Sequence, residues 1–322
     1  IIIITHKLNE VLEISDRVTI LRKGELVGTV DTKDATEQSL TEMMVGQKIE
    51  LNIHRDPPEN VKERLVIEDL SVIKKDGTVA LDNVQFTAYG GEILGIAGIS
   101  GCGQKELLES IAGLQTATKK SSILYKPDDL GPQQLVGKTP KEIRNLGIAL
   151  SFVPEDRLGM GLVGNMDIVD NVMLRSYKEG KSAFLNRKAP KLKADDIISE
   201  LEVVTPSANT PVRRLSGGNI QKVLVGREIA LQPKVLMVAY PVRGLDINSS
   251  YTIYNLLNQQ KDAGVAVIFV GEDLDVLLQL CDRIVVMCSG KVTGVLDARK
   301  TTKEEIGLLM TKTGGADIDK QD

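Results

Sequence analysis

The chain has 322 residues, of which 42% are hydrophobic, and 40 Lys and Arg against 44 Asp and Glu give a net charge of −4. This size and composition suit one large core with additional pieces, or two domains, and exclude a disordered or fibrous protein. The acidic excess argues against a nucleic-acid partner, and the three scattered cysteines indicate core residues of a cytosolic protein rather than a metal site or disulfide framework.

The first 46 residues resemble a later part of the same chain. Residues 1–46 align without a gap with residues 267–312, and ten positions are identical, among them Asp16 and its counterpart Asp282. Each copy is predicted to form an apolar strand, a short amphipathic helix, two short strands around a glycine turn and a closing helix. Since only the second copy follows a complete domain, we predict that residues 1–47 are the C-terminal piece of a domain whose first part is missing.

Residues 48–64 are predicted to be a linker, because they are charged, contain two prolines and lack helical or alternating periodicity. A complete domain is predicted for residues 65–313, followed by a disordered tail at 314–322. It begins with strands up to Gly98, and apolar strands then alternate with helices, which predicts a three-layer α/β domain. The predicted strands include 65–73, 147–153, 235–239 and 265–270, and the predicted helices lie around 168–176, 190–202, 218–230 and 249–262.

A glycine-rich turn follows the apolar strand that ends near Gly98. Gly98, Gly101 and Gly103 have the spacing of a phosphate-binding loop, in which glycines allow unusual dihedral angles and several N–H groups point at one phosphate. Ser100 and Cys102 lie between them. Where the consensus loop has a Lys and then a Ser or Thr that binds Mg²⁺, this chain has Gln104 and Lys105, so the loop is predicted to be degenerate.

The string LSGGNIQK at 215–222 lies just before a predicted helix. Ser216, the N–H groups of Gly217 and Gly218, and the positive end of that helix would form an anion site. This string resembles the signature sequence of ATP-binding-cassette (ABC) ATPases. The resemblance implies a P-loop three-layer ABC ATPase domain with an N-terminal antiparallel β subdomain and a helical subdomain.

Further motifs occur in the order of that family. Glu155, in SFVPEDR, stands at the glutamine of the family's glutamine loop, a segment that would face a membrane partner. Ala239 and Tyr240 replace the Asp that holds Mg²⁺ through water and the Glu that activates the attacking water. Asp246 belongs to the retained Leu-Asp loop.

The family's switch histidine maps to Glu272 in the second copy, whereas the first copy retains His6. Two cassettes face each other in this family, and each signature closes over the ATP of the other cassette. The resemblance therefore implies that Ser216, Gly217 and Gly218 act in trans on the site of the missing first domain, to which His6 belongs. This fragment alone is expected not to hydrolyse ATP, which its own loop would bind weakly or not at all.

The resemblance is strongest to tandem ATPases of bacterial monosaccharide and nucleoside importers, whose second cassettes carry phrases like VPEDR and RGLD. It implies Mg²⁺ at the competent site of the full-length protein, transmembrane permease subunits as partners, an indirect link to a substrate-binding protein, and a peripheral location at the cytoplasmic face of the membrane. One alternative is a soluble tandem ABC ATPase of the translation-factor type, although the long helical linker of that type is absent. Another is a non-catalytic regulatory module.

Overall fold

The structure is a computed structural model that describes residues 1–5, 8–22, 24–46, 53, 55–59, 61–145, 150–177 and 185–311. The expected switch residue His6 and the expected tail at 314–322 lie outside the described residues. Within the described part of the chain, no helix is long and apolar enough to cross a bilayer.

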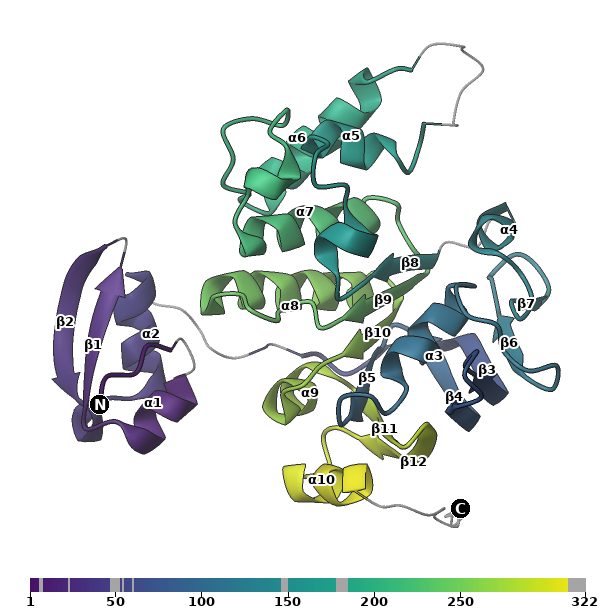
Figure 1. Ribbon diagram of the computed structural model, residues 1–322, viewed down its shortest axis with the longest axis horizontal. Coiled ribbons are helices and arrows are strands. Elements are labelled where there is room, and N and C mark those ends of the chain that lie inside the picture. The colour runs from purple at the N-terminus through teal and green to yellow at the C-terminus, as the bar shows by residue number, and fades with distance from the viewer. Residues whose placement is uncertain are drawn as a thin grey trace.

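A six-stranded sheet forms the centre of the main body, residues 62–311 (Figure 1). Apolar runs such as VLMVA and AVIFV are buried along their whole length, as expected for parallel strands that are covered on both faces. Only the edge pair β11 and β12 is antiparallel. The strands, in spatial order, are β12 (Lys291–Asp297), β11 (Arg283–Cys288), β5 (Ile93–Gly98), β10 (Ala266–Val270), β9 (Val235–Ala239) and β8 (Leu150–Val153).

An antiparallel sheet and helix α3 (Gln104–Ile111) share a core with one face of the central sheet. The first strand of this antiparallel sheet begins at Lys62, within the last three residues of the predicted linker. Lys62 pairs with Gly90 at the far end of the next strand, a tertiary contact that local sequence pattern does not reveal. The strands, in spatial order, are β4 (Val79–Gly90), β3 (Lys62–Ile73), β6 (Ser122–Tyr125) and β7 (Gln133–Gln134).

Helices cover the other face of the central sheet, which makes the main body three-layered as predicted. A helical region, residues 157–230, extends from this face, and Figure 1 shows it at the end of the molecule opposite to α10. It contains a π-helical turn (Arg157–Gly161), α5 (Ile168–Met173), α6 (Lys188–Glu200), a 3₁₀ helix (Val212–Arg214) and α7 (Gly217–Ile229). The other described α-helices of the main body, besides α3, are α4 (Pro140–Asn145), α8 (Ile247–Asp262), α9 (Leu274–Leu280) and α10 (Lys303–Thr311).

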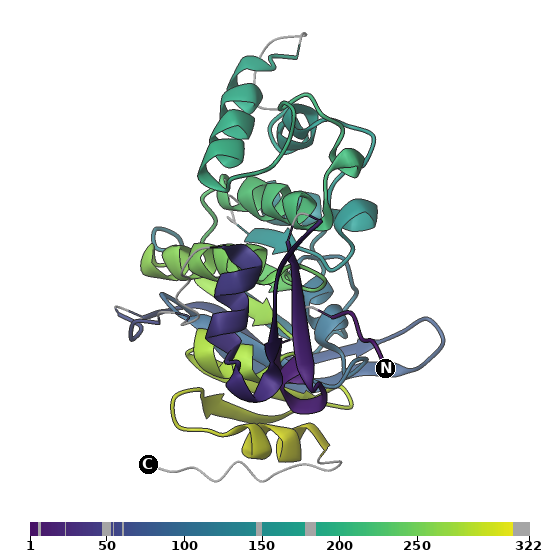
Figure 2. The same cartoon turned by 90° about the vertical axis from the view of Figure 1, so that its left-hand side faces the viewer.

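The N-terminal module, residues 8–46 (purple in Figure 2), repeats the last elements of the main body at the same sequence offset. Each of its two α-helices and two strands matches a later one residue for residue after a shift of 266, the difference between Arg17 and Arg283, whereas its 3₁₀ helix, Thr32–Asp34, corresponds to a turn at 298–300. Both hairpins have a register shift at matched positions, and Gly24 and Gly290 both adopt positive φ, at 83° and 79°. The module consists of α1 (Leu8–Ile14), β1 (Arg17–Arg22), β2 (Glu25–Asp31) and α2 (Glu37–Val45).

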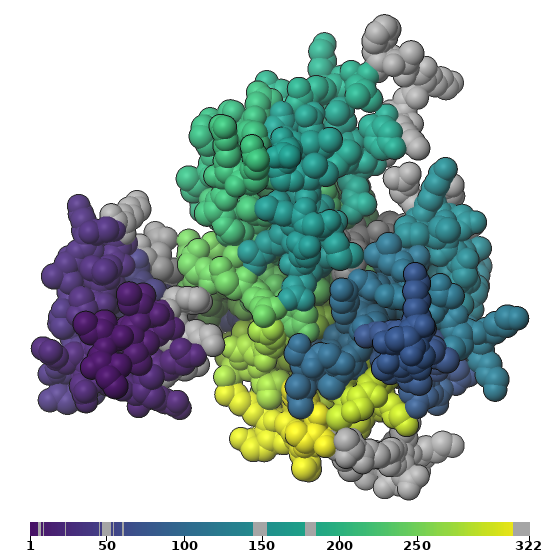
Figure 3. Space-filling model, in the orientation of Figure 1, coloured from purple at the N-terminus to yellow at the C-terminus, as the bar shows by residue number. Residues whose placement is uncertain are grey.

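The strand predicted at the start of the chain is absent, because residues 1–5 form no strand and the side chains of residues 1–4 are exposed. The matching strand of the second copy, β10, lies between β5 and β9. Among the described residues the first copy has no such neighbours, and an apolar segment without hydrogen-bonding partners cannot hold a strand. Figure 3 shows the module as a lobe beside the main body.

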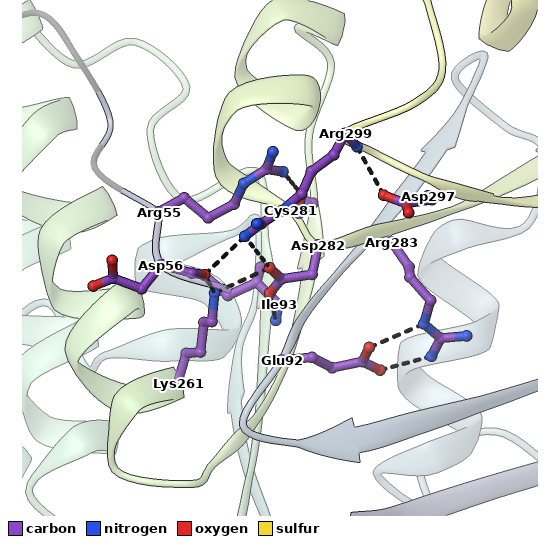
Figure 4. A network of polar contacts seen from close by, with 10 residues as sticks. All are labelled: Arg55, Asp56, Glu92, Ile93, Lys261, Cys281, Asp282, Arg283, Asp297 and Arg299. Atoms are coloured by element: carbon purple, nitrogen blue, oxygen red, sulfur yellow. Dashed lines mark hydrogen bonds and ion pairs between the residues drawn. The ribbon is translucent and has the colours of Figure 1, made fainter. Parts of the chain in front are cut away.

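Part of the predicted linker is fixed to the main body by buried charges (Figure 4). Lys261 Nζ donates to the carbonyl oxygen of Asp56 at 2.6 Å and pairs with Asp282 Oδ1 at 3.0 Å. Arg299 donates to the same carbonyl at 2.9 Å, and Arg55 donates to the carbonyl of Cys281. The linker prediction therefore missed an ordered contact at Arg55 and Asp56, which depends on residues more than 200 positions away.

Candidate nucleotide site and signature segment

The glycine-rich turn lies between β5 and α3, where a phosphate loop requires it. Gly101 and Gly103 adopt positive φ, at 88° and 101°, a region that favours glycine. A Cβ on Gly103 would lie 2.7 Å from the carbonyl oxygen of Ala80, so close packing also requires glycine there. Cys102, in the same turn, is only partly buried, unlike the core cysteines Cys281 and Cys288.

The two residues that replace the consensus Lys and Ser or Thr contact the protein itself. Gln104 is buried, and its Nε2 donates to the carbonyl oxygen of Ile99 within the loop at 3.2 Å. Lys105 is exposed, and its Nζ lies 3.8 Å from Glu109 Oε1 one helical turn further on. The loop therefore offers backbone N–H groups to a phosphate but no buried cation.

A cavity of about 260 Å³ opens beside the loop, and its lining is acidic. Glu109, Glu155 and Asp156 contribute carboxylates, whereas Lys105 is the only basic side chain among the described residues of the lining. Mg²⁺ prefers oxygen ligands in octahedral geometry, but Ala239 offers no side-chain oxygen, and no three His, Cys, Asp or Glu side chains in the described chain form a metal-binding group. The residues present therefore do not fit Mg²⁺, although the loop backbone fits a phosphate.

Four residues from three strand ends meet above this cavity. Arg243 Nη1 contacts Glu155 Oε1, and Arg243 Nε lies 3.7 Å from Glu272 Oε1. Burial, followed by the charges of these two carboxylates, raises the pKa of the neighbouring Tyr240. Sequence analysis placed Arg243 in the Leu-Asp loop, as the first residue of RGLD, but did not predict its contacts with Glu155 and Glu272.

The signature residues lie at the first turn of α7. Ser216 is the N-cap, and its Oγ accepts from the backbone N–H and the Nδ2 of Asn219, at 3.4 and 2.9 Å. Gly218 packs against Ser249 of α8, and Asp246 caps that helix by accepting from Ser249 N at 2.9 Å. The signature and the Leu-Asp loop are thus adjacent, but neither lines the cavity at the phosphate loop.

A second cavity, of about 550 Å³, lies on the helical region. Its rim includes the exposed side chains of Leu158, Met160 and Val163, and Arg175 and Arg227 also line it. Both arginines contact one carboxylate oxygen of buried Glu228, at 2.6 and 2.7 Å. Burial lowers the pKa of Arg227. This cavity therefore combines an apolar rim with a positively charged wall.

The fold and the two sites together define a nucleotide-binding cassette, and the comparisons identify its family. A family model described as ABC transporter matches residues 81–241, which is half of the 322-residue chain. The chain belongs to this family. A dimeric ATP-binding cassette in a post-hydrolysis state, bound to ADP and phosphate, has the same fold, with a TM-score of 0.63 at 23% identity over 74% of this chain and 100% of that chain.

Two relatives are similar along nearly all of this chain. The nucleoside import ATP-binding protein NupA of Lactococcus lactis is 34% identical over 313 residues, covering 96% of this chain and 60% of that protein. The xylose import ATP-binding protein XylG of Moorella thermoacetica is 37% identical over 321 residues, covering 98% and 61%. The chain thus spans about three-fifths of the length of these relatives.

Proposed function

We propose that the chain is the second cassette, with the last piece of the first, of the ATP-binding subunit of an importer for simple sugars or nucleosides. The names of the similar proteins support this cargo class. The observation that carries the proposal is the asymmetry within the chain. Its signature segment is intact and exposed, whereas the cavity at its own phosphate loop is acidic, and its described residues form no group of three metal-ligating side chains.

The proposed division assigns residues 1–47 to the first cassette, 48–64 to a linker and 65–313 to the second cassette. The N-terminal module supports it, because this module exposes what the second copy buries. Leu21 is 68% exposed, whereas its counterpart Met287 is fully buried against the central sheet. A cassette core that supplies a strand beside β1 would cover this apolar face in the same way.

Within this division the degenerate loop, Gly98–Lys105, would hold a nucleotide weakly and without hydrolysis. Phosphoryl transfer is catalysed by placed charges and an oriented nucleophile. Ala239 and Tyr240 supply neither a metal ligand nor a carboxylate base, and Glu272 brings negative charge to the switch position. Catalysis by the longer protein would therefore take place at the first cassette, with Mg²⁺ and His6 there and Ser216–Gly218 closing over its ATP.

The proposed partners are permease subunits at the cytoplasmic face of the membrane, with a substrate-binding protein engaged indirectly. The 550 Å³ cavity on the helical region suits a short helix from a permease, because its rim is apolar and the wall carries Arg175 and Arg227. Glu155 lies at the base of the helical region, so movement of a docked helix would reach the nucleotide site.

Charge at the rim of this cavity is expected to uncouple transport from hydrolysis. Leu158→Asp and Val163→Asp, each at a partly exposed side chain, should lower transport at least about tenfold, as expected when an interface anchor is lost. Basal ATP hydrolysis in detergent should stay near wild type. The matched control is Leu308→Asp on α10, at the opposite end of the molecule (Figure 1). Normal transport by both rim variants would show that the permease docks elsewhere.

A further inference from the structure

A chain of contacts, formed by an ion pair, a hydrogen bond and a packing contact, runs from the degenerate nucleotide site to the signature segment. It starts at Glu272, after strand β10, which lies 3.7 Å from Arg243 Nε. The carbonyl oxygen of Arg243 accepts a hydrogen bond from Arg157 Nη2. Arg157 Nη1 in turn lies against Gly217, only 3.2 Å from where a Cβ on that glycine would be.

Each link of this chain is held in place by the fold. Arg243 sits in a tight turn in which its N–H donates to the carbonyl of Tyr240 at 3.2 Å and Gly244 has a φ of 67°. Glu155, two residues after β8 ends at Val153, contacts Nη1 of the Arg243 guanidinium. Arg157 opens the π-helical turn and is partly buried.

The positive charge of Arg157 would be unfavourable in this position without the contact to Arg243. Its guanidinium lies beside Gly217, the first residue of α7, where the helix dipole is already positive. Burial also lowers the pKa of Arg157, since desolvation disfavours the charged form. The carbonyl oxygen of Arg243 offsets this cost by accepting a charge-assisted hydrogen bond, and the carboxylates of Glu155 and Glu272 balance the charge of Arg243.

We propose that Arg157 and Arg243 are positioning residues that hold the signature segment, Ser216–Gly218, in its orientation without nucleotide in this cassette's own site. In a competent cassette of the proposed type, Mg²⁺ and the γ-phosphate occupy the space between the glutamine and switch positions. Here Arg243 bridges those positions with its own charge. The role in catalysis rests on the proposed function, because the positioned signature would serve the ATP of the other cassette.

Amide hydrogen exchange on this chain tests the proposal without any need for hydrolysis. In the wild type, peptides within 213–222 should exchange at the same rate with and without ATP. Arg243→Gln and Arg157→Gln should each raise that rate roughly three- to tenfold, as expected when a local opening becomes easier. Peptides covering β9 and β10 should be unaffected, and the thermal unfolding midpoint should stay close to that of the wild type.

Two controls distinguish positioning from a general loss of packing. Arg299→Gln removes an arginine that contacts Asp56 and Asp282 and takes no part in the chain of contacts through Arg243 and Arg157. It should leave exchange in 213–222 unchanged. Arg243→Lys should restore the wild-type rate only in part, because an ammonium cannot bridge two carboxylates as a guanidinium does. Unchanged exchange in both Gln variants, or an equal rise with Arg299→Gln, would overturn the proposal.

A second readout uses a two-cassette polypeptide that contains this chain. Arg157→Gln and Arg243→Gln should lower kcat for ATP about tenfold while leaving KM nearly unchanged, since the signature contact develops mainly in the closed state. Faster exchange without any change in kcat would leave the contact chain standing but remove its part in catalysis. In that case the proposal that the signature acts in trans would be wrong, whereas the proposal that Arg157 and Arg243 position the signature segment would stand.

Discussion

Ser216→Arg is expected to abolish nearly all ATP hydrolysis by a two-cassette polypeptide that contains this chain, although Ser216 lies in the cassette that we propose to be degenerate. The exposed first turn of α7 would place a long guanidinium where the γ-phosphate of the other cassette must lie, and closure would be blocked. Loss of one anion-binding group at such a site costs about 100-fold or more in rate. Steady-state phosphate release, with intact folding checked by circular dichroism, measures the effect.

Two further variants show which site carries the chemistry. His6→Ala should give a similar loss, because His6 is assigned to the γ-phosphate contact of the same shared site. Gln104→Lys should barely raise the rate, since Ala239 and Glu272 would still deny this site a metal ligand and a switch histidine. Intact hydrolysis in Ser216→Arg together with a severalfold rise in Gln104→Lys would place catalysis at the loop of this chain.

Asp282→Ala is expected to destabilise this chain by about 3–5 kcal/mol, the range for breaking a buried ion pair by removing one partner. The side chains of Asp282 and Lys261 are 3% and 2% exposed, and Asp282 Oδ2 also accepts from the backbone N–H of Ile93 at 3.0 Å (Figure 4). Without Asp282, the Lys261 ammonium would stay buried with only the carbonyl of Asp56. Because the chain has no Trp, urea unfolding followed by far-UV circular dichroism is the suitable measurement.

Asp16→Ala is the matched control for this prediction. Asp16 is the counterpart of Asp282 in the first copy, but it is exposed in this chain. Its replacement should therefore change the free energy of unfolding by less than about 0.5 kcal/mol, as for most surface substitutions. A large loss of stability here would mean that the N-terminal module is already covered and does not expose the face of an incomplete cassette.

Local sequence pattern predicted the limits of those helices and strands whose signals lie in their own residues. The strand predicted at 235–239 has these limits in the structure, and the helix predicted at 218–230 is displaced by one residue. The strand is an unbroken run of apolar side chains, and the helix has a clear N-cap at Ser216. The early start of β3 at Lys62 and the missing strand at 1–4 depended instead on whether a neighbouring strand was present.

The candidate site was predictable to the same extent. Glycine spacing predicted a tight turn between β5 and α3, which the structure has, whereas the phosphate-binding role of this turn and the degenerate site inferred from Gln104 and Ala239 stay predictions. The bridge from Glu155 through Arg243 to Glu272 joins segments separated by 88 and 29 positions (243 − 155 and 272 − 243). Such a contact depends on how parallel strand ends converge at one edge of the sheet, which a single sequence does not specify.

The most direct test of the central claim is to locate the γ-phosphate of bound ATP in a two-cassette polypeptide that contains this chain. An ATP analogue with a photoreactive group on the γ-phosphate, bound with Mg²⁺ and irradiated, marks the residues that surround it, and mass spectrometry identifies the labelled peptides. The account predicts that labelling of this chain is concentrated within residues 213–222, around the signature. Labelling concentrated within residues 98–105, with none at the signature, would contradict it.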